Sequence, residues 1–440
     1  MTEQKNLAQC CDGLLFLNIF KTFRIAIQPA RILTAFLALT LLFIAGWLMD
    51  YSKTVVVSGQ VTRQDLSSLK LTGSLTWPTE LHCFVGDPER IEGFIERYKD
   101  KPDRQGVFKV WSNFCMARLN RAAASIVVLR FDNFVTSLTE CILASVWVLK
   151  YHTIYSIILF FIALVLFSIT SGAICRGAAL QFSRDERCGI TPCLKFALKK
   201  FISLFCAPLA PIIFIAACGL VLLGFGLIVN VPWAGEIFLA IVFIIVLIAG
   251  LCMALAIVGA GGGINLMSSV IAYENSDAFD GVNRSFSYIY TRPWRFSFYT
   301  LLAAVYGSVC YLFVRFSAFL MLTISRWFFS IIIWTEGSKA EQMNKLNVVW
   351  PKPEFFSLLG SDLEIPKNMT EDIASLIIYL EVLVVAGLVI AFAVSFYFSA
   401  SAIIYCLLRN KIDNTPLDNV FIEAEQATQL EQTQSTEQSG

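Results

Sequence analysis

The sequence predicts an all-α polytopic membrane protein with six transmembrane helices arranged as three hairpins. Three observations support this. Of the 440 residues, 57% are hydrophobic and only 15% are charged, which is too apolar for a soluble protein of this size. Six segments are long and apolar enough to cross a bilayer as helices, which takes about 20 residues. A short basic segment rich in aromatic residues precedes three of the six.

The loops between the six predicted spans differ in charge. Lys and Arg residues gather before the first span, between the second and third, between the fourth and fifth, and after the sixth. Because basic loops stay on the cytoplasmic side, we expect these segments and both termini in the cytoplasm of a bacterium, with the spans in its inner membrane. The spans are expected at 32–49, 153–175, 202–229, 235–260, 299–322 and 374–396.

The spans divide the chain into four predicted regions. The external region holds one strand-like stretch and helices apolar enough to lie on the membrane or on the bundle. The tail is rich in Glu, Gln, Thr and Ser, a composition that predicts disorder in the cytoplasm. The regions are an N-terminal interfacial helix with the first span (1–50), the external mixed region (51–150), a five-span bundle (151–413) and the tail (414–440).

An internal repeat is predicted from the segments that lead into the first, third and fifth spans. Each carries basic and aromatic residues and a proline near the entry to the span: Pro29, Pro208 and Pro293. This pattern is typical of amphipathic helices that lie at the cytoplasmic surface of a membrane. We expect such interfacial helices at 14–28, 192–203 and 277–291.

Small residues recur near the inner ends of the spans. Such residues let helix backbones approach closely in lipid, where apolar burial gives no drive for association. The alternative is that a run of glycines only kinks one helix. The candidates for close helix packing are Gly172, Gly259, Gly261, Gly262 and Gly263.

The stretch "ENSDAFDGVNRSFSYIYTRPWRF" (274–296) follows a span with an acid, a small-residue helix, a Ser-aromatic pair and an Arg/Trp re-entry. In this it resembles uncharacterised bacterial multi-pass families related to the membrane region of glycerophosphodiester phosphodiesterases. The resemblance covers a minor part of the chain and implies a polytopic membrane fold. It transfers no phosphodiesterase chemistry, because the soluble catalytic domain and its metal-binding carboxylates have no counterpart in this sequence.

The sequence offers no catalytic motif. It lacks HExxH, a Walker loop and Gly-x-Ser-x-Gly, and its two histidines, His82 and His152, lie far apart. Cys188 and Cys193 lack two further ligands for zinc. We therefore expect no catalytic residue, no cofactor, no metal and no nucleic-acid partner. Glu274 is interpreted as an ordinary solvated acid at the membrane surface.

Two pairs of residues are singled out. Arg315 and Glu381 are ionisable residues inside the fifth and sixth spans, and such residues are functional candidates by default. We expect an intramembrane ion pair between them, either structural or part of a transport path. Cys83 and Cys115 lie in polar sequence, where a disulfide could form in an oxidising compartment.

These features favour a non-enzymatic integral membrane protein with a structural, scaffold or assembly role. Its expected partners are the lipid bilayer and other membrane proteins. The alternative is a transporter or channel for a small solute, because transporters are often built from repeats. A path lined by Asn265, Ser268 and Ser269 would favour transport, whereas a dry bundle would favour the scaffold.

The predicted orientation can be tested with cysteine reagents. In sealed cells, a membrane-impermeant maleimide should spare Cys188 and Cys193, because both lie in a basic loop expected in the cytoplasm. Labelling of either residue in sealed cells would reverse the orientation.

Overall fold

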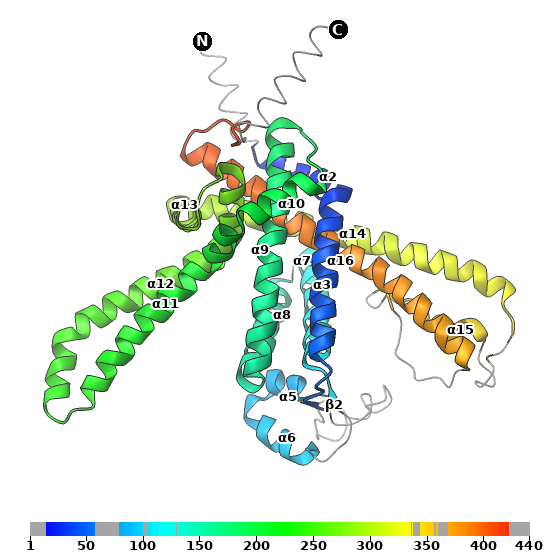
Figure 1. The fold of residues 1–440 in the computed structure, drawn as a ribbon, viewed down its shortest axis with the longest axis horizontal. Coiled ribbons are helices and arrows are strands. Elements are labelled where there is room, and N and C mark those ends of the chain that lie inside the picture. Colours follow the sequence, from blue (N-terminus) through cyan, green and yellow to red (C-terminus); the bar gives the residue numbers. More distant parts are fainter. Residues whose placement is uncertain are drawn as a thin grey trace, which may run out of the picture. The chain divides into compact units, whose positions relative to one another are not determined.

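The computed structural model describes residues 15–57, 79–99, 104–128, 130–335, 344–355 and 368–421, with 337, 358 and 359. This part of the chain is predominantly helical (Figure 1). Seven helices are long and apolar enough to cross a membrane, so the protein is an all-α multi-pass membrane protein. They are α3 (Pro29–Met49), α8 (Phe131–Tyr151), α9 (Thr153–Arg184), α11 (Phe201–Val229), α12 (Ala234–Glu274), α14 (Pro293–Ile332) and α16 (Met369–Ile412).

All six predicted spans lie within these helices, and α8 is the additional candidate. From the sequence, the residues of α8 were expected in the external region, as a helix lying on the membrane or on the bundle. Its mean hydropathy of 1.3 is the lowest of the seven. By length and composition alone, the helices therefore allow seven crossings where six were expected.

Several helices are much longer than a bilayer requires. Helix α12 has 41 residues, α14 has 40 and α16 has 44. At about 1.5 Å per residue, each is about 60 Å long, whereas the hydrocarbon core is about 30 Å thick. These helices therefore continue well beyond the hydrocarbon.

Three of the long helices are followed by an Asp or Asn in the left-handed conformation. The φ angles are 58° at Asp185 after α9, 55° at Asn275 after α12 and 52° at Asn414 after α16. Asp and Asn tolerate this conformation better than other residues with a side chain, and it commonly ends helices. Asp185 and Asn275 directly follow their helices, whereas Asn414 lies one residue further from the end of α16.

Short helices occur at the three positions where interfacial helices are predicted. A 3₁₀ helix, η1 (Leu15–Phe20), and α2 (Lys21–Ala26) come before α3. Helix α10 (Ile190–Lys199) comes before α11, and α13 (Ala278–Thr291) comes before α14. Each short helix leads into a long one after at most a few residues.

The chain forms two compact units. Unit 1 comprises residues 1–35, 167–303 and 394–440, and unit 2 comprises 36–166 and 304–393. Helices α3, α9, α14 and α16 contribute residues to both units.

The core of unit 1 lies where α9 and α10 meet the α11–α12 hairpin, which Figure 1 shows in green. In the parts of the hairpin beyond this core, the apolar side chains are largely exposed. Such a surface suits lipid or other membrane helices. The buried core consists of Ala173, Cys193, Ala197, Leu204, Ala207, Met267 and Ile271.

Unit 2 contains a small mixed cap. Strands β1 (Val55–Val56) and β2 (Arg104–Gln105) pair antiparallel. Helices α5 (Glu80–Gly86) and α6 (Ile91–Tyr98) pack with the first turns of α7 (Val107–Val127) and the last turns of α8 around one apolar cluster. This cluster includes Leu81, Ile91, Val110, Phe114, Trp147 and Val148. We call this body the α5–α8 cap.

Asp50 ties three helix ends together in unit 2. Its carboxylate accepts hydrogen bonds from the backbone N–H groups of Phe108 (2.9 Å) and Lys109 (2.8 Å), in the first turn of α7. It also accepts one from the hydroxyl of Tyr155 (2.7 Å), near the start of α9. The first N–H groups of a helix lack intrahelical partners and attract negative charge, so Asp50 acts as a cap from outside α7.

Elsewhere in unit 2, α14 packs against α16. Leu322, Val382 and Val389 are buried between them, and Leu358 joins the cluster from the connecting segment. This segment also contains α15 (Lys345–Val349).

The α5–α8 cap shields both histidines of the chain from most of the solvent, and Nε2 of His152 lies 3.9 Å from a carboxylate oxygen of Glu80. Burial lowers the pKa of His82 to about 4, with a further contribution from the charge of Arg118, and burial also lowers the pKa of His152. A depressed histidine pKa stabilises the fold above the unfolded value of about 6.5, and this stabilisation is lost as the pH falls from there towards 4. For His82 the loss is about 3 kcal/mol when complete. We therefore expect the unfolding temperature in detergent to fall over this pH range.

The substitution His82→Phe isolates the contribution of His82. It keeps a ring against Phe114, which the imidazole contacts edge-on, and removes the titration. The variant should lose part of the decrease in unfolding temperature. The buried Glu80 titrates in the opposite direction, since burial raises its pKa, and it is common to both proteins. Identical pH profiles for wild type and His82→Phe would contradict the assignment.

Candidate functional site

The last turn of α12 brings together four helices and the C-terminal segment of the chain. The final carbonyls of a helix lack intrahelical partners and attract cations. Here Arg176 of α9 donates a hydrogen bond to the carbonyl of Ala272 (2.9 Å), and Lys200 donates one to that of Asn275 (2.7 Å). Cations from two other parts of unit 1 therefore satisfy the end of α12.

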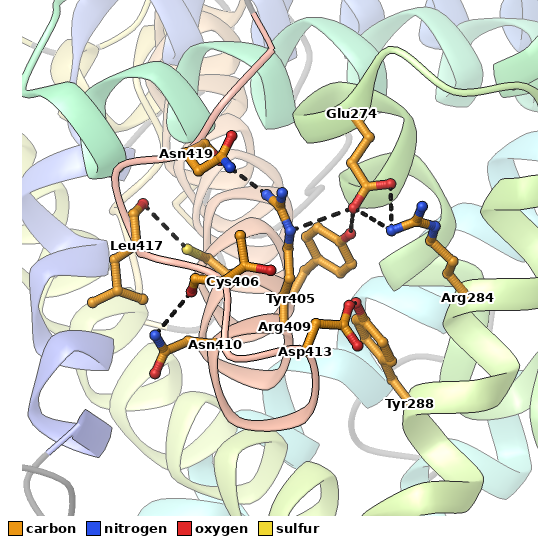
Figure 2. A network of polar contacts seen from close by, with 11 residues as sticks. Glu274, Arg284, Tyr288, Tyr405, Cys406, Arg409, Asn410, Asp413, Leu417 and Asn419 are labelled. Carbon is orange, nitrogen blue, oxygen red and sulfur yellow. Dashed lines mark hydrogen bonds and ion pairs between the residues drawn. The ribbon is translucent and has the colours of Figure 1, made fainter.

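Glu274, the last residue of α12, lies at the centre of a charged network (Figure 2). A guanidinium nitrogen of Arg284, on α13, lies 2.8 Å from both carboxylate oxygens. Tyr405 of α16 donates its hydroxyl hydrogen to one of them (2.6 Å), and Nε of Arg409 lies 3.4 Å from the same oxygen. The Glu274 side chain is only 11% exposed. The sequence interpretation of Glu274 as a solvated acid is therefore wrong.

Aromatic residues surround this carboxylate. The rings of Tyr288 and Tyr405 stack with centroids 5.7 Å apart. The ring of Tyr273 also contacts that of Tyr405, with centroids 5.4 Å apart. The Tyr288 hydroxyl donates to the carboxylate of Asp413, as Figure 2 shows. Burial, reinforced by this hydrogen bond, raises the pKa of Tyr288, so its hydroxyl stays protonated and keeps donating.

The C-terminal segment, residues 415–421, folds back onto this network. Arg409 donates to the carbonyl of Asn419 (2.9 Å), and Asn410 donates to that of Thr415 (2.9 Å). The backbone of Phe421 donates to Tyr273 (3.0 Å) and accepts from Arg176 (2.8 Å). The tail predicted from residue 414 thus begins with a packed segment, and residues 422–440 lie outside the described part of the chain.

The charges of the network balance internally. Glu274 and Asp413 face Arg284, Arg409 and tyrosine hydroxyls, and donors occupy the carboxylate of Glu274. A general base needs a lone pair aimed at a substrate, and here the carboxylate is engaged with the protein. Within the described residues, no group of three His, Cys, Asp or Glu side chains is arranged to hold a metal ion. The arrangement can join helix ends and fix the C-terminal segment.

Arg315 lies in a different polar cluster, in unit 2. It is buried and donates to Oδ1 of Asn120 (2.8 Å), the hydroxyl of Tyr311 (2.8 Å) and the carbonyl of Phe355 (2.7 Å). Glu381 is exposed on α16. The Arg315–Glu381 ion pair stays a prediction.

Four of the five predicted packing glycines lie against side chains of other helices. A Cβ on Gly259 would meet Phe286 of α13 at 2.9 Å, and one on Gly262 would meet Phe296 of α14 at 3.0 Å. Gly263 faces Ile289 at 3.2 Å, and Gly172 abuts Leu204 of α11. A Cβ on Gly261 would meet nothing within 4 Å, so close packing gives no reason for a glycine there.

Cys83 and Cys115 are free thiols in the structure, and the disulfide between them stays a prediction. Cys83 lies on α5 in the cap core. Cys115 lies on α7, where the thiol of Cys141 on α8 donates to its carbonyl (3.9 Å). Tight packing of α7 against α8 therefore gives Cys115 another cysteine as its neighbour.

The sequence did contain a signal for the network. Glu274 ends an apolar span, and Arg284 and Arg409 were both assigned to the cytoplasmic side. The sequence did not show that the end of α12 meets α13 and α16. Comparisons with protein-family models, with curated proteins and with solved structures gave no match for this chain.

The contribution of the network can be measured with Glu274→Gln. Removing one member of a largely buried ion pair leaves its partners without compensation, which costs about 3 kcal/mol. We expect a clear decrease in the unfolding temperature in mild detergent. We also expect faster proteolysis of the C-terminal segment, because the network no longer holds it. Glu236→Gln is the control on the same helix, at an exposed position, and should behave as wild type. Equal stability of the two variants would show that the network contributes nothing.

Proposed function

We propose that this protein is a non-enzymatic scaffold or assembly protein of a bacterial inner membrane, with six spans in three hairpins and both termini in the cytoplasm. The observation that carries the proposal is the pairing of polar side chains where α9, α12 and α16 meet. A transport path needs polar groups that face water or solute. Here these groups hydrogen-bond to each other instead.

The pairing involves small side chains on all three helices. Ser268 donates to Ser171 (3.0 Å), and Ser269 donates to Ser401 (3.4 Å). The thiol of Cys175 lies 3.6 Å from the hydroxyl of Ser269. All five side chains are buried. Hydrogen bonds between small polar residues hold helices together in lipid, so this seam suits a structural core.

Continuous helices also favour the scaffold. Pro208 and Pro211 could have broken the third span, as transporter spans often are. Helix α11 runs through both prolines from Phe201 to Val229.

The threefold repeat is supported by the common ends of α9, α12 and α16. When these helices are aligned on Asp185, Asn275 and Asp413, whose N–H groups each bond to the carbonyl four residues earlier, the residues Gly172, Gly262 and Ala400 fall at the same position. A small residue thus recurs at one register in each helix, near the contact with its neighbours. The short helices α10 and α13 follow α9 and α12, at positions where the repeat predicts interfacial helices.

The packing of α7 against α8 is compatible with six spans. The two helices are joined by a short connection, and the first turns of α7 and the last turns of α8 lie in the α5–α8 cap. A chain that leaves the cap along α7 therefore returns to it along α8. Such a re-entrant hairpin leaves the predicted sides of all later segments unchanged, and both termini remain cytoplasmic.

The exposed surface of the α11–α12 hairpin is the proposed contact with lipid and with other membrane proteins. We suggest a photoreactive amino acid at Leu223, which is 69% exposed, with Leu204, 1% exposed on the same helix, as the control position. In living cells, Leu223 should give discrete adducts with other membrane proteins and Leu204 should give none. Vesicles holding the purified protein should be no more permeable to ions and small solutes than empty vesicles.

The transport alternative makes the opposite prediction. Solute flux that depends on the protein, and that Ser269→Leu abolishes without unfolding it, would replace the scaffold with a transporter. Adducts at Leu223 to lipid alone would remove the docking role.

A further inference from the structure

Two cysteines lie together at the junction of α9 and α10. Cys188 is half-buried in the turn after α9, and Cys193 is buried in the first turn of α10. Their thiol groups hydrogen-bond to each other. Cys193 belongs to the core of unit 1, and Cys188 packs against the same core from the turn. Arg187 and Gly189, on either side of Cys188, are exposed, so Cys188 is the sulfur that a solute reaches first.

A buried arginine lies beside this pair. Arg31 is 4% exposed and donates to Gln181 (2.8 Å), to the carbonyl of Gly177 (2.6 Å) and to that of Ile25. Its Nε–H is buried and makes no hydrogen bond. A Cβ built on Gly177 would lie 3.2 Å from this Nε and 3.3 Å from the sulfur of Cys193. The unused donor and the sulfur therefore face the same small space, which Gly177 leaves open.

The surroundings are suited to a thiolate. Besides Arg31, the guanidinium of Arg176 contributes positive charge near both sulfurs. The hydrogen bond from Cys193 lowers the pKa of the Cys188 thiol, helped by Arg176 and Arg31, while the same bond and burial raise the pKa of Cys193. A thiolate next to a protonated thiol, near arginines, is the arrangement of reactive cysteine pairs.

We propose that Cys188 and Cys193 form a redox-active dithiol that undergoes thiol–disulfide exchange with a low-molecular-weight disulfide, and that Arg31 positions and stabilises it. Cys188 is the attacking sulfur and Cys193 the resolving sulfur. The site is independent of the scaffold role.

The exchange proceeds in two balanced steps. The Cys188 thiolate attacks one sulfur of the small disulfide, whose S–S bond breaks and releases one thiolate. Cys193 loses its proton to that thiolate and attacks the Cys188 sulfur, which breaks the mixed disulfide and releases the second thiolate. The products are a Cys188–Cys193 disulfide and two small thiols, so the small disulfide is reduced and the protein pair is oxidised.

Oxidation changes the charge around Arg31. The disulfide cannot ionise, so the buried guanidinium no longer has a neighbouring group that can carry a compensating negative charge. Because Arg31 also binds Gln181 and the Gly177 carbonyl of α9, the redox state acts directly on the contact between the start of α3 and α9 in unit 1.

Oxidised glutathione is the probe for the test, used with the full-length protein in mild detergent. After remaining thiols are blocked, trypsin releases residues 188–195 as one peptide, which contains these two cysteines and no others. We expect this peptide to lose two hydrogens and to carry no blocking group. The Cys193→Ser variant should instead keep glutathione on Cys188, and Cys188→Ser should react poorly at Cys193. A wild-type peptide that keeps two thiols, or carries two glutathiones, would overturn the proposal.

The role of Arg31 is tested by the pH profile of Cys188 alkylation in Arg31→Lys. This change keeps the charge and removes the Nε–H donor. We expect a lower alkylation rate of Cys188 at neutral pH, because lysine lacks the Nε–H that faces the Cys193 sulfur. Arg24→Lys is the matched control, since Arg24 forms only an exposed ion pair with Asp185 (2.7 Å) nearby. Equal rates in the two variants would remove Arg31 from the site.

Discussion

The C-terminal end of α12 has to be satisfied by the rest of unit 1. A helix leaves its last carbonyls without partners, and close to a membrane there is little water to replace them. Arg176 and Lys200 bind these carbonyls, and Glu274 then binds Arg284, Tyr405 and Arg409. Arg176 of α9, Lys200 and the backbone N–H of Phe421 meet this requirement directly, and α13 and α16 join through the side chain of Glu274.

Polar side chains inside unit 1 also need hydrogen-bond partners. Serines on α9, α12 and α16 pair with each other inside the unit, while the α11–α12 hairpin presents apolar residues outward. Such pairing joins helices to each other, and the proposed scaffold role rests on it. Beside the Cys188–Cys193 pair, Arg31 keeps one buried donor without a hydrogen bond.

The sequence was most informative where a single periodic property decides the structure. Hydropathy over about 20 residues placed all six predicted spans within helices, and basic aromatic segments marked three positions where short helices occur. Glycines were harder to interpret, because only the neighbouring side chain distinguishes Gly262, which faces Phe296, from the open position of Gly261. The helix α8 was missed as a candidate span because its hydropathy barely differs from that of a helix lying on a bundle.

By itself, the sequence determined the membrane class and the placement of the apolar helices, since transfer into lipid depends on local composition. It also supplied the Asp and Asn residues that end three long helices. Only the tertiary structure decided which charges meet. Glu274 and Arg409 lie far apart in the chain, as do Arg31 and Cys193, and no local pattern records such contacts. Their strength depends on the burial that packing creates, so the Glu274 network forms where the sequence indicated a solvated acid.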